Sequence, residues 1–283
     1  MGVVLEMLSY PFLVRALVGG ALVSLCASLL GVSLVLKRYS MIGDGLSHVS
    51  FGALSVALAA GWQPLKVSIP VVILAAFFLL HIRENGRLKS DAAIAVISAS
   101  ALAFGIIVTS LTTGMTTDVS SYMFGSILAM SREDVRLSAV LSAVVLGLFL
   151  FCYHKVFAVT FDESFARATG VNVPFYNVLI AVLTAVTIVL GMRMMGAMLI
   201  SSLIIFPCLS AMQAVKSFGG VVILSGMLSV VCFFGGMTAS YVYSLPAGAS
   251  VVAVNLAVFL MLAGARRAVL WRGKKKRLGD KEL

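Results

Sequence analysis

Long apolar runs separated by short polar stretches form the dominant pattern of this chain. A helix needs about 20 predominantly apolar residues to cross the hydrocarbon core of a bilayer. Nine runs qualify as candidate spans: 12–36, 44–60, 66–82, 93–112, 135–153, 176–192, 196–213, 219–240 and 248–268. The sixth and seventh could be two helices in a tight hairpin, or one helix broken at Gly191 and Gly196. We therefore predict an all-α integral membrane protein, a polytopic bundle of eight or nine transmembrane helices.

The composition agrees with this pattern. Apolar residues make up 61% of the 283 residues and charged residues only 11%, whereas soluble domains average roughly 45–50% and 25%. The polar stretches between the apolar runs are too short to form a separate water-soluble domain. We predict a single transmembrane domain over residues 1–268, followed by a basic cytoplasmic tail over residues 269–283.

The positions of lysine and arginine predict the orientation of the chain. These residues are enriched in the cytoplasmic loops of membrane proteins. With nine crossings and the tail inside, eight of the 21 basic residues fall in inner loops, eight lie from Arg266 onward, and five fall outside. The N-terminus is then predicted to lie outside. Because the basic residues lie at membrane edges, the net charge of +10 does not indicate a nucleic-acid partner.

A candidate docking element lies in the inner loop after the fifth run. Residues 161–170 read Phe-Asp-Glu-Ser-Phe-Ala-Arg-Ala-Thr-Gly. Asp162 and Glu163 suit the start of a short helix, Arg167 its last turn, and Gly170 the residue after its end. Such a helix on the membrane surface can dock a partner, or it can be an ordinary interfacial helix with none. The residues alone leave both interpretations open.

An aspartate and a histidine near the start of the second run form a candidate metal site. Asp44 and His48 are four positions apart, so on a helix they share one face, one turn apart. A carboxylate and an imidazole can both ligate a divalent cation, and ionisable groups inside membrane segments are functional by default. Alternatively, Asp44 caps its helix and His48 bonds a backbone carbonyl. Two residues do not complete a coordination sphere.

Several stretches, taken in order, resemble the permease subunits of the zinc/manganese/iron ABC importer family. The matching stretches are 37–48 (KRYSMIGDGLSH), 122–128 (YMFGSIL), 161–170, 203–207 (LIIFP, with a helix-breaking proline) and 245–248 (LPAG). The resemblance covers the chain from about residue 12 to residue 265. Gly45 departs from an alanine common in the family, and Phe51-Gly52 stands where Leu-Pro-Gly is frequent.

The resemblance implies an ABC-importer permease fold in which two copies of the chain form the pathway. An extracytoplasmic metal-binding protein would deliver the ion, and the location would be the bacterial cytoplasmic (inner) membrane. Asp44 and His48 fall at positions that the family uses for metal passage, and Asp118 is a further acidic gate candidate. The 161–170 helix would dock into a separate ATPase subunit through Phe161, Asp162, Glu163, Phe165, Ala166, Arg167 and Gly170.

The motifs of the chain indicate a pathway and not an energy source. No Gly-x-x-x-x-Gly-Lys-Ser/Thr sequence is present, so ATP would be hydrolysed by a partner polypeptide. No His-Glu-x-x-His or Gly-x-Ser-x-Gly sequence supports an enzyme, and we expect no cofactor bound by this chain.

We therefore expect a permease subunit of an ABC importer for divalent metal ions. Imidazole with carboxylate favours zinc, whereas an oxygen-rich ligand set would admit manganese or iron. Two alternatives stay open. A secondary metal/proton transporter would use the Asp–His pair as a proton relay, and an ABC permease for a chelated substrate, such as a siderophore, would not need the pair.

Overall fold

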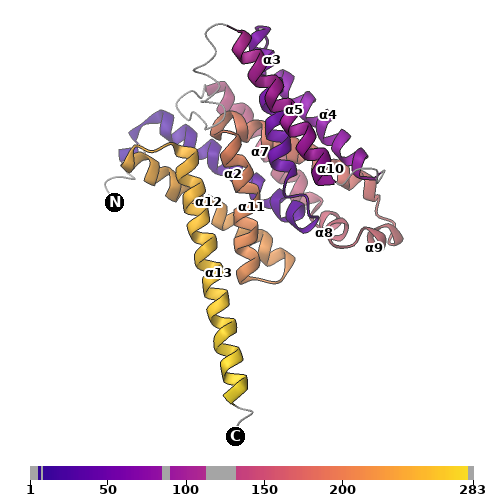
Figure 1. Cartoon of the computed structure of the whole chain (residues 1–283), viewed down its shortest axis with the longest axis vertical. Coiled ribbons are helices and arrows are strands. Elements are labelled where there is room, and N and C mark those ends of the chain that lie inside the picture. Colours follow the sequence, from indigo (N-terminus) through magenta and orange to yellow (C-terminus); the bar gives the residue numbers. More distant parts are fainter. Residues whose placement is uncertain (1–5, 8, 85–89, 113–131, 280–283) are drawn as a thin grey trace.

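The computed structural model describes residues 6–7, 9–84, 90–112 and 132–279, and within these ranges the regular structure is helical, without strands. Long helices pack into one bundle, from which the last helix extends (Figure 1). The helices are α2 (Pro11–Leu36), α3 (Ile42–Ala59), α4 (Pro64–Glu84), α5 (Ser90–Leu111), α7 (Arg132–Phe151), α8 (Tyr153–Phe161), α9 (Glu163–Ala168), α10 (Val173–Met195), α11 (Ala197–Ala214), α12 (Phe218–Tyr243) and α13 (Ala247–Gly279).

Each predicted span corresponds to a helix. In the described part of the chain, eight helices are long and apolar enough to cross a membrane, namely α2 to α5 and α10 to α13. Helix α7 passes the same test only together with α8, from which it is bent by 69°. The number of spans is therefore eight, or nine if the bent pair crosses, and the predicted polytopic helical fold is confirmed.

The junction between α10 and α11 is a single residue. Gly196 has φ +85° and ψ 160°, a conformation that only glycine adopts readily. Gly191, near the end of α10, lies directly against the Ile200 side chain of α11. The two helices thus pack against each other beside the break, and each is long enough to span by itself. The sequence expectation of a tight, glycine-mediated junction is met without a connecting loop.

Helix α3 is packed closely against α5, and two glycines make this possible. A Cβ atom on Gly45 would lie 2.7 Å from Cγ2 of Ile94, and one on Gly52 would lie 2.8 Å from the carbonyl oxygen of Ala101. Small residues let membrane helices approach this closely. Gly45 stands where an alanine is common in the family, and its contact with α5 is a physical reason for the smaller residue.

Connections that the charge rule assigns to the same side of the membrane lie together in the structure. Lys37, between α2 and α3, pairs with Glu163 of α9. Phe218, at the start of α12, lies with its ring centroid 5.0 Å from that of Phe157 and 5.8 Å from that of Phe161. In Figure 1, α8 and α9 lie toward the lower side of the bundle, the side from which α13 extends. This grouping agrees with the predicted topology.

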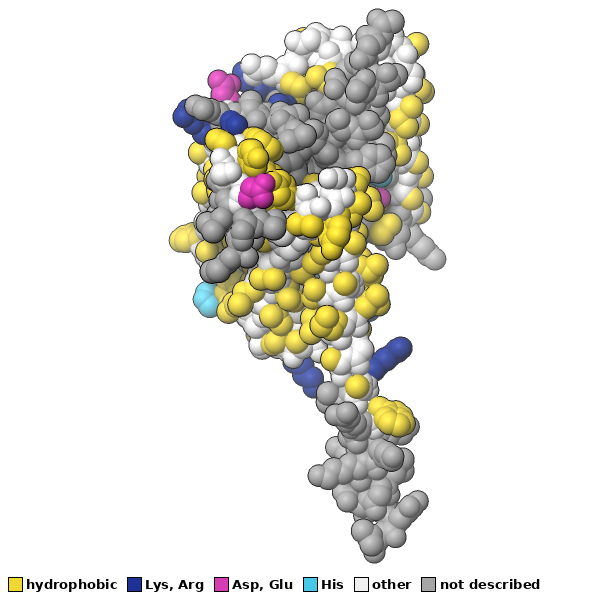
Figure 2. Space-filling view, turned by 90° about the vertical axis from the view of Figure 1, so that its left-hand side faces the viewer, with side chains coloured by type: hydrophobic (Ala, Val, Ile, Leu, Met, Phe, Trp, Pro, Cys, Tyr) yellow, Lys and Arg dark blue, Asp and Glu magenta, His cyan; other side chains and the backbone are white. Residues whose placement is uncertain are grey.

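Helix α13 continues beyond its membrane-spanning part. The span covers Ala247–Ala268, whereas the helix reaches Gly279. The predicted tail over 269–283 therefore begins as a continuation of the last span, and the boundary at residue 268 stays a prediction. Figure 2 shows apolar side chains over the lower flank of the bundle and Lys and Arg side chains where α13 leaves it. An apolar belt with basic residues at its edge is typical of a membrane protein.

Replacing Gly52 by alanine is expected to destabilise the protein. The added Cβ would meet the carbonyl oxygen of Ala101, which belongs to the backbone and cannot swing aside. Overpacking of this kind costs about 1–3 kcal/mol, so the thermal unfolding midpoint in detergent should fall. Gly147→Ala in α7 is the matched control, since nothing lies within 4 Å of its added Cβ. Equal midpoints for both variants would contradict the close contact of α3 with α5.

Candidate functional site

Asp44 and His48 lie on one face of α3, as their spacing predicts. His48 Nε2 is 3.6 Å from Asp44 Oδ2. Asp44 is in the first turn of the helix, whereas the N-cap position is occupied by Met41. The alternative in which Asp44 serves as the helix cap is therefore not the arrangement found. The pair is close enough for both side chains to reach one ion.

The Asp44 side chain is open to its surroundings. It is 48% exposed, against 18% for His48, although most residues of α3 are buried. Ser201 of α11 donates its hydroxyl to the carbonyl oxygen of Ala197 at 3.2 Å. A half-exposed carboxylate facing lipid would be costly. This part of α3 must therefore face water or a second protein surface.

Packing places the start of α3 inside the bundle. Gly31 of α2 lies against the backbone of Ile204, and Gly43 lies against the side chain of the same residue. Gly31 is five residues before the end of α2, which is roughly 8 Å at 1.5 Å per residue. The site is thus set back from the end of α2.

A single copy of the chain offers an incomplete ligand set. Among the described residues, no group of three or more His, Cys, Asp or Glu side chains is placed to hold a metal ion. Asp118, the third candidate, lies outside the described residues, as does the 122–128 stretch. Asp44 and His48 can therefore supply two ligands, and any further ones must come from elsewhere.

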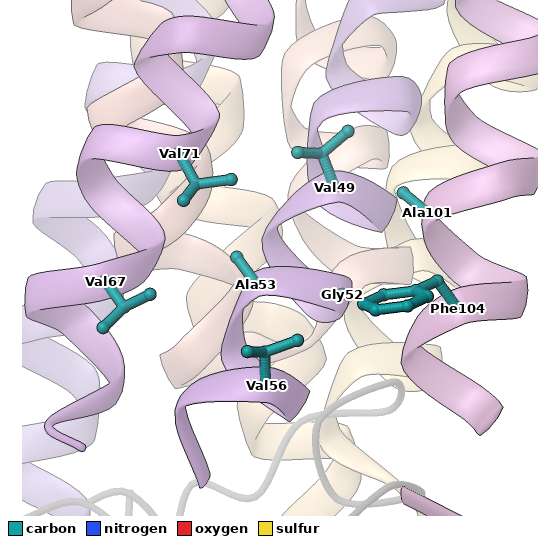
Figure 3. A pocket seen from close by; sticks show the side chains of 8 residues that line it. All are labelled: Val49, Gly52, Ala53, Val56, Val67, Val71, Ala101 and Phe104. Atoms are coloured by element: carbon teal, nitrogen blue, oxygen red, sulfur yellow. The ribbon is translucent and has the colours of Figure 1, made fainter. Parts of the chain in front are cut away.

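A hollow of about 270 Å³ lies between α3, α4 and α5, beside the same helix that carries the pair. Figure 3 shows that every side chain lining it is a hydrocarbon. The lining residues are Val49, Gly52, Ala53, Val56, Val67, Val71, Ala101 and Phe104. Such a surface provides no ligand for a cation, so we do not assign it to the ion pathway.

The predicted docking helix is present and capped as expected. Asp162 Oδ1 accepts hydrogen bonds from the backbone N–H groups of Ser164 and Phe165, each at 2.9 Å. Gly170 follows the helix with φ +82°, which suits glycine. Sequence reasoning missed α8, the helix that precedes this segment. Its buried residues, Val156 with Val159 and Thr160, have the helical spacing that would have revealed it.

The candidate coupling residues divide into two sets that face in different directions. Phe161 and Phe165 are 58% and 64% exposed, and Arg167 is exposed as well. Ala166 is fully buried, whereas Glu163 is directed at Lys37. The aromatic and basic side chains thus form an outward surface, and Ala166 and Glu163 fix the helix to the bundle. The coupling role of these residues stays a prediction.

A buried polar cluster joins α9 to the rest of the bundle, and sequence reasoning missed it. Lys37 Nζ lies 2.7 Å from Glu163 Oε1 and 2.5 Å from Asn177 Oδ1, and Asn177 Nδ2 donates to Glu163 Oε1 at 3.3 Å. The Lys37 side chain is only 5% exposed. A buried charge must be paired to be tolerated. Asn177, a lone amide in the run 176–192, was the available signal.

Comparisons with known proteins agree with this architecture. A family model described as the ABC 3 transport family matches residues 9–265. A manganese transport system membrane protein of Halalkalibacterium halodurans is 26% identical over 275 residues, or 95% of this chain and 94% of the relative. A high-affinity zinc uptake system membrane protein of Haemophilus influenzae is 27% identical over 89% of this chain and 97% of its own.

The fold is also similar to a solved structure. PsaBC from Streptococcus pneumoniae, solved in complex with a Fab, matches with a TM-score of 0.82 and 28% sequence identity. The alignment covers 92% of this chain and 95% of the matched chain. The similarity therefore extends over most of the chain.

Asp162→Ala is expected to loosen α9, because it removes the oxygen that caps the helix. Loss of an N-cap costs about 1 kcal/mol, so amide hydrogen exchange at Ser164 and Phe165 should accelerate about fivefold. Asp162→Asn keeps a capping oxygen and should exchange at the wild-type rate. If the asparagine variant exchanges as fast as the alanine variant, the charge and not the cap holds α9.

Proposed function

The chain belongs to the ABC 3 transport family, and we propose that it is the membrane permease of an ATP-driven importer for divalent metal ions. It is a transport subunit and not an enzyme, as are the relatives named for manganese and zinc transport. In this proposal ATP is hydrolysed by a separate ATPase subunit, and the chain itself holds no resident cofactor. The metal is its cargo.

The half-exposed Asp44 beside His48 is the observation that carries the proposal. Each copy of the chain contributes one carboxylate and one imidazole. Two copies facing each other across a pathway would bring together four such ligands, the number that zinc takes in tetrahedral sites. The openness of Asp44 in one copy supports a homodimer, because the second copy would cover a carboxylate that lipid cannot.

Zinc is the cargo that the ligand types favour. Imidazole nitrogen suits zinc, whereas manganese prefers oxygen-rich sites, and iron accepts both kinds of ligand. Relatives named for manganese and for zinc are about equally similar to this chain. We therefore propose zinc as the first candidate and manganese or iron as alternatives, with Asp118 as a possible further oxygen ligand.

The remaining partners follow from an importer of this kind. An extracytoplasmic metal-binding protein would deliver the ion, and the chain would lie in the cytoplasmic (inner) membrane of a bacterium. Residues 1–268 would form the permease domain, with the basic tail inside. The outward aromatic surface of α8 and α9, with Arg167, would bind the ATPase. Aromatic and arginine side chains are the usual anchors of such interfaces.

Asp44→Ala combined with His48→Ala is expected to reduce metal uptake by more than about tenfold. Even substitution of residues that only hydrogen-bond to a metal ligand lowers metal affinity or activity about 10–100-fold. Uptake of zinc and of manganese should be measured separately in cells that lack their own importers. His81→Ala, which removes an exposed histidine outside the pair, is the matched control. Uptake at the wild-type rate in the double variant would refute the site and favour a chelated substrate.

Phe161→Ser combined with Phe165→Ser is expected to weaken binding of the ATPase by about thirtyfold or more, because exposed aromatic anchors contribute more than about 1 kcal/mol each. Co-purification with the ATPase measures this directly. Trp62→Ser is the control, because Trp62 is equally exposed and lies in a connection predicted to be on the outer side. Undiminished co-purification would show that α8 and α9 do not form the docking surface. A secondary transporter, which needs no ATPase, would have no docking surface there.

A further inference from the structure

The Lys37–Glu163–Asn177 cluster joins three segments that are distant in the sequence. Lys37 ends α2, Glu163 opens α9, and Asn177 lies in the second turn of α10. Both oxygen partners of Lys37 Nζ are within hydrogen-bond distance, and Asn177 also donates to Glu163. The carboxylate is therefore held from two directions. A displacement of α9 relative to the bundle must move Lys37 or break this contact.

The turn that follows Lys37 is rigid. Tyr39 N–H donates to the carbonyl oxygen of Leu34 at 2.7 Å, and Arg38 N–H donates to that of Val35 at 3.0 Å. Together these two bonds form a Schellman motif. Arg38 has φ +61°, in the left-handed region that usually takes glycine. A non-glycine residue persists there only when its surroundings fix it, so the surroundings of the turn hold it in this conformation.

The same turn leads directly into the candidate metal site. Helix α3 begins at Ile42, which is buried, and Asp44 lies in its first turn. Asp44 is seven residues after Lys37, and the connecting backbone is hydrogen-bonded through Ile42 N–H to the Tyr39 carbonyl at 3.0 Å. The cluster thus lies at one end of a short, ordered segment and the Asp–His pair at the other.

We propose that the Lys37–Glu163 pair, held by Asn177, is the link that carries movement of α9 to the start of α3 and so to Asp44 and His48. Glu163 then acts as a positioning residue inside the permease, and the docking surface consists of the outward side chains. The inference rests on the proposed function, since it takes α9 as the ATPase-docking helix and the Asp–His pair as the metal site.

The chemistry of the Lys37–Glu163–Asn177 cluster favours a role in connecting α9 to the start of α3 over a role in stability alone. A buried ion pair contributes little net stability, because desolvation offsets much of the attraction. It does, however, fix geometry, since removing one partner leaves the other charge buried and unpaired. Glu163 is 38% exposed, whereas Lys37 is only 5% exposed. The carboxylate on the moving helix therefore reaches inward to a cation that is anchored in the bundle.

The test measures zinc transported per ATP hydrolysed by the permease assembled with its ATPase in liposomes, with the metal-binding protein supplied. Assemblies are purified with the ATPase bound, so that free ATPase does not add to the ATP hydrolysed. Glu163→Gln keeps the shape and one oxygen acceptor but removes the charge. The Glu163→Gln variant is expected to lower the zinc-to-ATP ratio at least about fivefold. A change of about fivefold is the lower end of the effect that one site typically has on another when the two are coupled. Glu133→Gln, an exposed carboxylate on α7, is the matched control and should leave the ratio unchanged.

A charge-reversed pair distinguishes a link from a general loss of structure. Lys37→Glu with Glu163→Lys restores an ion pair with the charges exchanged, and it should recover at least half of the ratio that Lys37→Glu alone abolishes. An unchanged ratio in Glu163→Gln, or no recovery in a reversed pair with a wild-type unfolding midpoint, would overturn the link. If instead the wild-type assembly moves none of zinc, manganese and iron, the proposed function fails before the variants are compared.

Discussion

Inside a bilayer, helices gain little by covering apolar surface with other apolar side chains, because the lipid tails are equally apolar. Association then depends on close packing and on hydrogen bonds between helices. Gly31 of α2 lies against the backbone of Ile204 in α11, and Gly236 of α12 lies against Val251 in α13. Ser229 donates a hydrogen bond to the carbonyl oxygen of Ser24 at 2.9 Å. Small residues thus decide which helices meet and at what height.

The same constraint determines where the Asp–His pair is exposed. Gly43 is turned toward α11 and Gly45 toward α5. Successive residues of a helix are about 100° apart, so Asp44 projects between these two neighbours. Its carboxylate has His48 Nε2 at 3.6 Å and is half open. The two glycines that permit close packing therefore flank the position from which the Asp44 side chain projects. The open face of α3 results from packing and does not require a separate cavity.

The sequence predicts the helices well because the bilayer imposes long apolar runs. It also predicts α9, because Asp162 and Gly170 act locally as cap and terminator. Sequence reasoning missed α8, although the spacing of its buried residues is helical, because the apolar character continues from α7 and the 69° bend occurs at Cys152 with no proline or glycine. The Lys37–Glu163 contact spans 126 positions. A pairing of that range leaves no local pattern, and only the assembled bundle brings the two residues together.

The two polar sites of the chain differ in how completely their charges are satisfied. The Lys37 ammonium is buried and bonded to two oxygens, whereas the Asp44 carboxylate has a histidine at 3.6 Å and an open side. An ion pair whose buried charge is fully hydrogen-bonded is hard to separate, because separation would leave that charge buried and unpaired. An incompletely coordinated carboxylate is free to accept an ion, and a site with few ligands also releases it. The hydrogen-bonded turn after Lys37 joins the Lys37–Glu163 ion pair to the Asp44–His48 pair. In the proposed link, movement of α9 would change the position of the Asp44–His48 pair without first breaking the bundle.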